Sequence, residues 1–170
     1  MSARAAADKR DGLAFNLTAK GVAEVEAEQK RVASDQAFVA MSFDPAMKPV
    51  YDDRLHPGIR NAGYKPFRVD RHDHANRIDD EIMAQIRRSR FVVADFTGQN
   101  HGVYFEAGFA LGLSLVIWSC RKSDIPGLHF DVRQYNCIDW AAPDELARRL
   151  TVRIEAILGM GPQPVPARAA

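Results

Sequence analysis

Two acidic residues flank a polar loop in the segment FVVADFTGQNHGVYFEAGFALGLSLVIWS, residues 91–119. The segment reads as a buried strand, a polar loop, a helix and a second buried strand. On this reading Asp95 ends the first strand, and Glu106 lies in the first turn of the helix. An α/β sheet binds its ligands in the crevice beyond the carboxyl ends of its parallel strands. Two carboxylates delivered there predict chemistry on a small polar molecule.

Glu106 is the first catalytic candidate. The positive end of a helix dipole favours the charged form of a carboxyl in the first turn. An ionised carboxylate in a crevice can attack an anomeric carbon or stabilise an oxocarbenium-like charge there. The alternative is that Glu106 only stabilises its helix, by a few tenths of a kcal/mol to about 1 kcal/mol. We interpret Gly108 and Gly112 as residues that let this helix approach the sheet closely.

Asp95 is the second catalytic candidate, and two roles are open for it. It can orient a sugar hydroxyl or accept a proton, or it can cap the backbone amides of its own loop. The loop residues Thr97, Gly98 and Asn100 lead into a helix N-terminus, which suits recognition of phosphate or carboxylate by backbone amides. The loop matches neither the GxGxxG nor the P-loop pattern.

The segment RVDRHDHANR, residues 68–77, suggests a metal site through His72, Asp73 and His74. We reject this interpretation, because adjacent ligands in a loop rarely converge on a metal without a third ligand from elsewhere. An arginine of the segment, Arg71 or Arg77, is better suited to pair with an anionic group of a substrate. No metal is therefore expected, and no Ser-His-Asp or Cys-His constellation is legible.

Length, net charge and hydrophobic pattern limit the kinds of molecule that this chain is expected to bind. The chain has 170 residues and a net charge of +1, which indicates no direct nucleic-acid binding and no membrane binding. No apolar run approaches the roughly 20 residues of a membrane span. The N-terminal residues lack the apolar middle of a signal peptide, so we expect a cytoplasmic protein. Cys120 and Cys137 are expected to be reduced and do not make a zinc site.

The hydrophobic pattern alternates between strands and helices. The helix expected at 46–62 contains Pro57, which should kink it or divide it in two. The helix at 77–89 has Ile78, Ile82 and Ile86 on one face. Strands are expected at 37–43, 64–69, 91–94, 115–119 and 135–140, and helices at 18–33, 46–62, 77–89, 103–113 and 143–158.

Such alternation predicts right-handed crossovers and a parallel sheet with helices on both faces. We therefore expect an α/β fold, a flavodoxin-like three-layer sandwich with a five-stranded mainly parallel sheet and an N-terminal helical arm. The first strand should be central with the third beside it, which places the ligand crevice between their carboxyl ends. The candidate substrate-binding residues at that edge are Ser42, Phe43, Asp70, Arg71, Thr97, Gly98, Asn100 and Tyr104.

Four segments are expected along the chain. Residues 1–11 and 159–170 should be disordered tails, residues 12–34 a strand and helix arm, and residues 35–158 the α/β domain. The arm sequence LAFNLTAKGVAEV resembles the end of a winged-helix domain, and we interpret it as a remnant or a packing arm. Its helix carries an apolar stripe at Val22 and Val25, with Val32 as a third candidate.

Residues 36–140 resemble the nucleoside 2-deoxyribosyltransferase-like superfamily and its relatives, the TIR-like nucleotide-binding domains. The resemblance rests on AFVAMSF, on RIDDEIMAQIRRSRFVVADFTG and above all on GVYFEAGFALGLSLVIW. The last is similar to the family's Gly-x-x-Phe-Glu-x-Gly-x-Ala helix, whose Glu is the nucleophile that cleaves the N-glycosidic bond. The resemblance implies that role for Glu106, a sugar-holding role for Asp95 and a place in the base pocket for Phe43. Asn100 is a departure, because many transferases carry Asp there.

Two functions follow from these residues. The first is an N-glycosidase or deoxyribosyltransferase-like enzyme that cleaves the base–sugar bond of a nucleoside, a nucleotide or NAD. Glu106 would act at C1′, Asp95 and Asn100 would hold the sugar hydroxyls, and Phe43 would stack on the base. The alternative is a TIR-like nucleotide-binding or signalling module, with defence as one candidate setting, in which Glu106 is structural. The resemblance implies a homo-oligomer. No cofactor is expected, because the loop FDPAMKP at 43–49 lacks the Ser/Thr/Gly-rich phosphate loop that flavin mononucleotide needs.

Overall fold

The computed structural model describes residues 18–71 and 78–166, without the side chains of residues 27, 28, 30–32, 71 and 78. Its centre is a sheet of five parallel strands in the order β2-β1-β3-β4-β5. This is the flavodoxin-like order that the sequence predicts, with the first strand central and the third beside it. The strands are β1 (Gln36–Ala40), β2 (Lys65–Phe67), β3 (Phe91–Asp95), β4 (Leu115–Arg121) and β5 (Ile138–Trp140).

Apart from the first and the last, the helices lie between successive strands, as crossovers between parallel strands require. Short 3-10 turns at Pro45–Met47, Val69–Arg71 and Lys122–Gly127 lead from the ends of β1, β2 and β4. The helices are α1 (Ala19–Val32), α2 (Lys48–Val50), α3 (His56–Asn61), α4 (Ile78–Arg88), α5 (His101–Leu111), α6 (Phe130–Arg133) and α7 (Pro143–Leu158). The strands and helices expected between residues 18 and 158 are therefore present, whereas the turn and helix within 122–134 were not expected. The strand expected in the arm before residue 18 lies outside the described residues.

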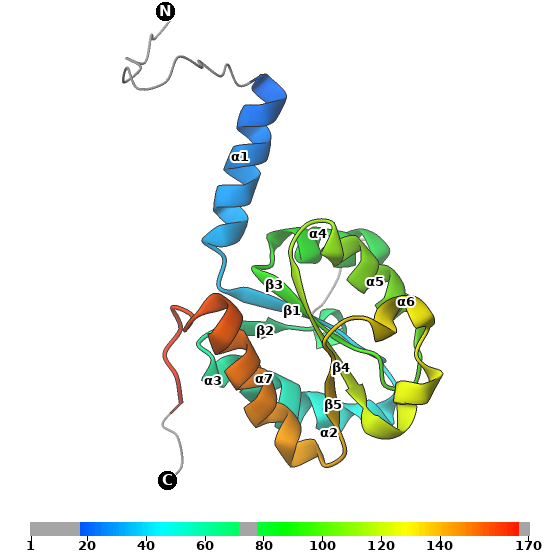
Figure 1. Ribbon diagram of the computed structural model, residues 1–170. Coiled ribbons are helices and arrows are strands. Elements are labelled where there is room, and N and C mark those ends of the chain that lie inside the picture. The colour runs from blue at the N-terminus through cyan, green and yellow to red at the C-terminus, as the bar shows by residue number, and fades with distance from the viewer. Residues whose placement is uncertain (1–17, 72–77, 167–170) are drawn as a thin grey trace, which may run out of the picture.

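The strands are buried on both faces, which explains their continuous apolar sequences. All five residues of β3 are buried, and its side chains alternate between two cores because successive residues of a strand face opposite sides. Phe91 and Val93 belong to the core under α3 and α7, whereas Val92 and Ala94 belong to the core under α4 and α5. The sheet is thus the middle of three layers (Figure 1).

The connection from β1 to β2 is one nearly continuous helical path with a wide turn. Residues Tyr51–Leu55 form a π-helical turn, in which the backbone N–H of His56 donates to the carbonyl of Tyr51. Proline lacks an N–H, and its ring crowds the carbonyl four residues earlier. The wide turn lies directly before Pro57 and gives its ring room. The predicted helix is therefore divided into α2 and α3 by a π-helical turn directly before Pro57.

The segment after α7 is described as far as residue 166, and it contacts the residues that follow α3. The N–H of Gly161 donates to the carbonyl of Ala62 at 2.8 Å, and the N–H of Gln163 donates to that of Gly63 at 3.0 Å. Gly63 ends α3 with a φ of +81°, and a Cβ there would lie 2.6 Å from the carbonyl oxygen of Gly161. The expectation of a loose tail from residue 159 is therefore wrong for residues 159–166.

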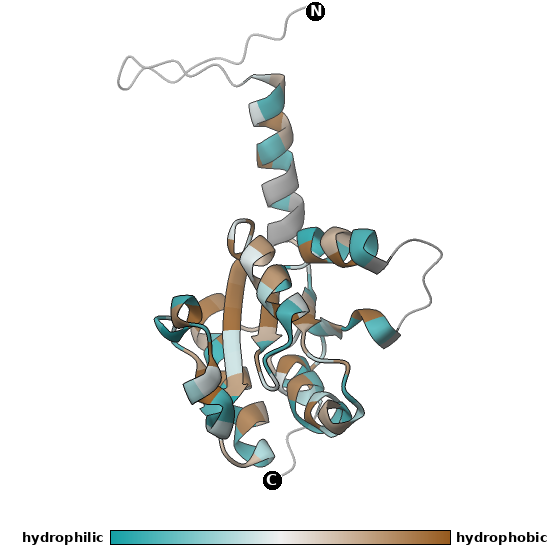
Figure 2. Ribbon diagram, turned by 90° about the vertical axis from the view of Figure 1, so that its right-hand side faces the viewer, coloured by the Kyte–Doolittle hydropathy of each residue, from teal (hydrophilic) through white to brown (hydrophobic). Residues whose placement is uncertain are grey.

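The helix α1 extends away from the α/β body and touches it mainly near α4 (Figures 1 and 2). Two members of its expected apolar stripe, Val22 and Val25, are 42% and 44% exposed. The third, Val32, lies outside the described side chains. The interpretation of α1 as a winged-helix remnant stays a prediction. Within residues 18–71 and 78–166, no helix has the length and apolar character of a membrane span.

Candidate functional site

The carboxyl ends of β1, β2 and β3 form one edge of the sheet, and Arg68 organises part of it. The Arg68 side chain is 2% exposed, and its guanidinium donates to the carbonyl of Ser42 at 3.4 Å. Its Nε lies 2.8 Å from Oδ1 of Asp70. One arginine therefore joins the loops that follow β1 and β2, at the switch point where α/β sheets bind ligands.

Phe43 lies on this arginine. The guanidinium carbon of Arg68 is 5.3 Å from the centre of the Phe43 ring and 5.1 Å from that of Tyr51, distances that suit cation–π contact. Tyr51 is buried, whereas Phe43 is 46% exposed. The exposed ring is thus supported from the protein side and presents aromatic surface to solvent. The three predicted residues Ser42, Phe43 and Asp70 are brought together here.

Glu106 lies in the second turn of α5. The helix begins at His101, because the side chain of Asn100 accepts a hydrogen bond from the N–H of Gly102 at 2.8 Å and caps the first turn. The predicted place of Glu106 in the first turn is therefore wrong. The helix dipole acts mainly on the first turn, so it no longer explains an ionised Glu106. Asn100 thus caps the helix through its side-chain oxygen, and its contact with a sugar stays a prediction.

The environment of Glu106 favours the neutral acid. Burial raises the pKa of this carboxyl from its usual 4.5 to about 7. No ion pair involves Glu106 among the described residues. Phe109, three residues along the helix, packs under the guanidinium of Arg87, which places this flank of α5 against α4. The predicted shift toward the ionised form is thus reversed, because loss of hydration outweighs the helix dipole.

This pKa gives a test of stability. Below pH 4.5 Glu106 is protonated in both the folded and the unfolded chain. As the pH rises through about 7, the folded state loses stability, because ionisation is easier in the unfolded chain. Glu106→Gln should therefore raise the free energy of unfolding at pH 8.5 by on the order of 1 to 3 kcal/mol, and change it little at pH 4. Urea unfolding at both pH values measures this, with the exposed Glu26→Gln on α1 as control. An equal effect at both pH values would contradict a raised pKa.

Asp95 has no exposed surface. Its Oδ1 accepts from the N–H of Thr97 at 3.0 Å, and its Oδ2 accepts from the hydroxyl of Ser119 at 2.6 Å and from the indole N–H of Trp140 at 3.3 Å. Burial raises the pKa of this carboxyl although these hydrogen bonds act in the opposite direction. Asp95 thus joins the ends of β3, β4 and β5. Of its two sequence-based roles, capping of its own loop is the one observed, and a substrate has no access to it.

Three other side chains of the kinds that act as nucleophiles lie in β4 or directly before β5, and none of them is activated. The hydroxyl of Ser119 is buried and committed to Asp95. Burial raises the pKa of both Cys120 and Cys137 to about 12, so neither thiol supplies a thiolate at neutral pH. Both are free cysteines, and they are not joined to each other.

The loop from β3 to α5 is held from within the protein. The N–H of Gly98 donates to the Asp124 carboxylate at 2.9 Å, and the hydroxyl of Thr97 accepts from the N–H of Arg121 at 2.9 Å. Thr97 is 2% exposed. The predicted anion-binding role of this loop is therefore not supported, because its groups already have protein partners. Gly98 has a φ of +77°, a backbone conformation that favours glycine.

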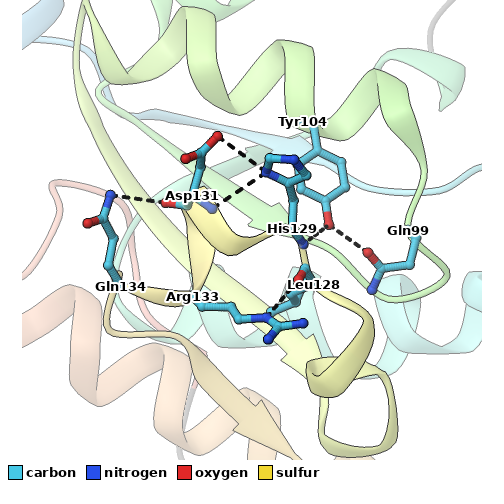
Figure 3. Close-up of polar contacts among 7 residues, drawn as sticks. All are labelled: Gln99, Tyr104, Leu128, His129, Asp131, Arg133 and Gln134. Carbon is cyan, nitrogen blue, oxygen red and sulfur yellow. Dashed lines mark hydrogen bonds and ion pairs between the residues drawn. The ribbon is translucent and has the colours of Figure 1, made fainter.

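Tyr104 lies two residues before Glu106 and therefore on the opposite side of α5. Figure 3 shows its side chain beside His129 and Gln99. Its hydroxyl donates to Oε1 of Gln99 at 2.6 Å and accepts from the N–H of His129 at 3.3 Å. Tyr104 lines an open cleft of about 830 Å³ between α5 and α6. Glu106 is not part of that cleft. The predicted site residues thus divide between two regions, and Tyr104 does not belong with Ser42 and Phe43.

Some predicted residues cannot be placed. The side chain of Arg71 and all of residues 72–77, which include His72, His74 and Arg77, lie outside the described residues. Among the side chains that are described, no three His, Cys, Asp or Glu residues converge as metal ligands do.

Sequence reasoning missed the α5–α6 cleft altogether. Its far wall comes from residues 122–135, which show neither strand nor helix periodicity. The sequence feature that could have indicated this cleft is the aromatic and polar run HFDVRQY at 129–135. The sequence also did not predict that Arg68 links the loops after β1 and β2, because its packing on Phe43 and Tyr51 depends on residues from another strand connection.

Comparison with known proteins supports the fold. No protein-family model matches the chain, and no curated protein matches it. One similar solved structure is a 2-desoxiribosyltransferase from Leishmania mexicana, with a TM-score of 0.50 and 13% sequence identity. The similarity covers 69% of this chain and 97% of that one. This chain therefore shares the α/β fold of that protein, and the likeness at this identity is one of fold.

Proposed function

We propose that this protein cleaves the N-glycosidic bond of a nucleoside, a nucleotide or NAD, with Glu106 as the reacting carboxylate. The observation that carries the proposal is a partly buried glutamate in the helix after β3, with a pKa raised to about 7 and no ion pair among the described residues. Burial of a carboxyl in this way costs stability and is typical of functional sites. The fold shared with a 2-desoxiribosyltransferase adds support.

In this mechanism the ionised Glu106 attacks C1′ of the sugar. The C1′–N bond breaks, its electron pair goes to the base, and the base takes up a proton as it leaves. Water, or a second base in a transfer reaction, then displaces the glutamate from C1′. A poorly hydrated carboxylate is well suited to this attack, because little water must be removed from it. The raised pKa means that the reaction needs a pH near or above 7.

Phe43 is the proposed stacking surface for the base. Base–aromatic stacking contributes about 1 to 3 kcal/mol per base. Phe43→Ala should therefore raise KM by roughly ten-fold and leave kcat within a few-fold, because the ring binds the base and does not react. Steady-state kinetics of base release measures both constants. Phe130→Ala, which removes another exposed phenylalanine from α6, is the control. An unchanged KM for Phe43→Ala would remove this residue from the site.

The experiment that tests the function uses a panel of nucleosides, deoxynucleosides, their monophosphates and NAD. Each compound is incubated with the protein at pH 8, and free base is followed by chromatography, with and without a second base as acceptor. Release by the wild type names the substrate, and exchange of bases distinguishes transfer from hydrolysis. Sedimentation at the assay concentration tests the proposed homo-oligomer. No release from any compound would leave the alternative of a nucleotide-binding module, which equilibrium binding of the same panel then tests.

A further inference from the structure

An open cleft lies between α5 and the segment that contains α6. Figure 3 shows residues of both walls, with Tyr104 on one side and His129, Asp131 and Gln134 on the other. Its volume of about 830 Å³ is in the range of small-molecule sites. The lining residues are Gln99, His101, Tyr104, Gly108, Leu111, Trp118, Gly127, His129, Asp131, Val132, Gln134 and Tyr135.

Two aromatic residues of the lining, Trp118 and Tyr135, stack on each other with ring centres 4.3 Å apart and planes 6° apart. Behind them the buried Phe96 stacks on Trp118, with centres 5.3 Å apart and planes 10° apart. Tyr104 packs against Phe96 with centres 4.8 Å apart and planes 58° apart. Trp118 is only 7% exposed, so the ring surface left to a ligand is that of the half-buried Tyr104 and Tyr135. A further planar ring can pack against these two rings face to face or edge to face.

Hydrogen bonds across the cleft hold its walls at a fixed separation. The Tyr104 hydroxyl accepts from the N–H of His129, and the amide of Gln99 donates to the carbonyl of Asp124 at 3.2 Å. On the far wall the guanidinium of Arg133 donates to the carbonyls of Leu128 and Pro126. The cleft is therefore formed before any ligand arrives, as most small-molecule sites are.

Gly108 is a glycine within α5 that leaves the cleft open. A glycine inside a helix costs stability relative to alanine. Here it serves no close approach, because a Cβ at Gly108 would meet no atom within 4 Å. The interpretation that Gly108 lets α5 approach the sheet is therefore wrong. Gly108 opens onto the cleft, so a side chain there would occupy the volume that a ligand would use.

The charged side chains that line the cleft determine which class of ligand it can bind. No lysine or arginine lines the cleft, and Asp131 adds a negative charge. The Nδ1 of His129 faces Asp131 and lies 3.5 Å from its backbone nitrogen and 3.3 Å from its Oδ2. The cleft thus disfavours phosphate and suits an uncharged ring.

We propose that this cleft is a second ligand site, which binds an uncharged planar heteroaromatic molecule without a phosphate group. The site is separate from the proposed reaction site, because Glu106 lies on the other flank of α5. It does not depend on the proposed function, since binding here requires no cleavage.

The test uses adenine as an uncharged planar probe, adenosine monophosphate as the same ring with a phosphate, and ribose as a ligand without a ring. Changes in the amide NMR spectrum of the wild-type protein are followed during titration to millimolar concentrations. Adenine should bind with a submillimolar Kd and shift amides of residues 104–111 and 128–135. Adenosine monophosphate should bind at least ten-fold more weakly to these residues, and ribose should not bind. Shifts confined to other regions, or no adenine binding, would overturn the proposal.

Two glycine variants of the same helix form a matched pair. Gly108→Leu should weaken adenine binding at least ten-fold, because its side chain fills the cleft. Gly112→Ala should leave binding within two-fold, because Gly112 does not line the cleft and a Cβ there meets only the Phe109 carbonyl at 3.7 Å. Circular dichroism establishes that each variant is folded. If Gly108→Leu is folded and binds adenine like the wild type, the proposal is wrong.

Discussion

Glu106→Gln should lower the rate of base release at pH 8 by a factor of roughly 10⁴ or more, the scale seen when a reacting group is removed from an enzyme. Glutamine keeps the shape of glutamate but does not form the glycosyl ester, so substrate binding should be retained. Glu106→Asp, which withdraws the carboxylate by one methylene, should retain more activity than Glu106→Gln. Single-turnover assays and equilibrium binding of the same substrate measure these effects. Loss of binding together with loss of turnover would indicate a structural role for Glu106.

The pH dependence of the wild type reports which protonation state of Glu106 reacts. With the pKa of Glu106 raised to about 7, kcat/KM should rise about ten-fold per pH unit well below 7 and level off above it. A rate that falls as the pH rises through 7 would make Glu106 a general acid. A profile without a transition near 7 would contradict the assignment of this residue as the reacting group.

Asp95→Ala should lower the free energy of unfolding by about 3 to 5 kcal/mol, because it leaves buried donors without acceptors and opens a cavity. The donors are the N–H of Thr97, the hydroxyl of Ser119 and the indole N–H of Trp140. Asp95→Asn keeps the volume and one acceptor oxygen, so it should lose less stability. Urea unfolding at pH 7 measures both variants.

The same pair distinguishes a structural Asp95 from a catalytic one. If Asp95 is structural, the folded fraction of Asp95→Asn should release base at a rate within a few-fold of the wild type. A fully folded Asp95→Asn with a rate lowered by roughly 10³ or more would restore the catalytic role that the sequence suggested. Asp139→Asn on β5, whose carboxylate pairs with Arg149 at the protein surface, is a suitable control.

The sequence by itself determined the fold, because its signals are local. The apolar run at Phe91–Asp95 predicts a strand buried on both faces, and it is fully buried. The pattern of Leu146, Leu150 and Ile154 predicts the buried face of α7, and all three are buried. Short crossovers between such elements leave few strand orders, which is why the order of the sheet could be predicted.

The sequence also determined which residues stand at the sheet edge, but the tertiary structure decided what each one does. Asn100 is a helix-capping residue type, and its capping moves the start of α5 and takes Glu106 out of the first turn. The Asp95 carboxylate accepts hydrogen bonds from Ser119 and Trp140, which come from two other strands. No local pattern records such partners, because they meet only when the sheet forms.

Only the tertiary structure decided the electrostatics of Glu106 and the existence of the α5–α6 cleft. The pKa of Glu106 depends on how much water neighbouring segments exclude from it, and that exclusion is a property of packing. The cleft requires residues as distant in sequence as Gln99 and Tyr135 to face one another. Hydrophobic periodicity specifies which side of an element is buried, whereas the shape and hydration of a surface between elements follow from their final distances and angles.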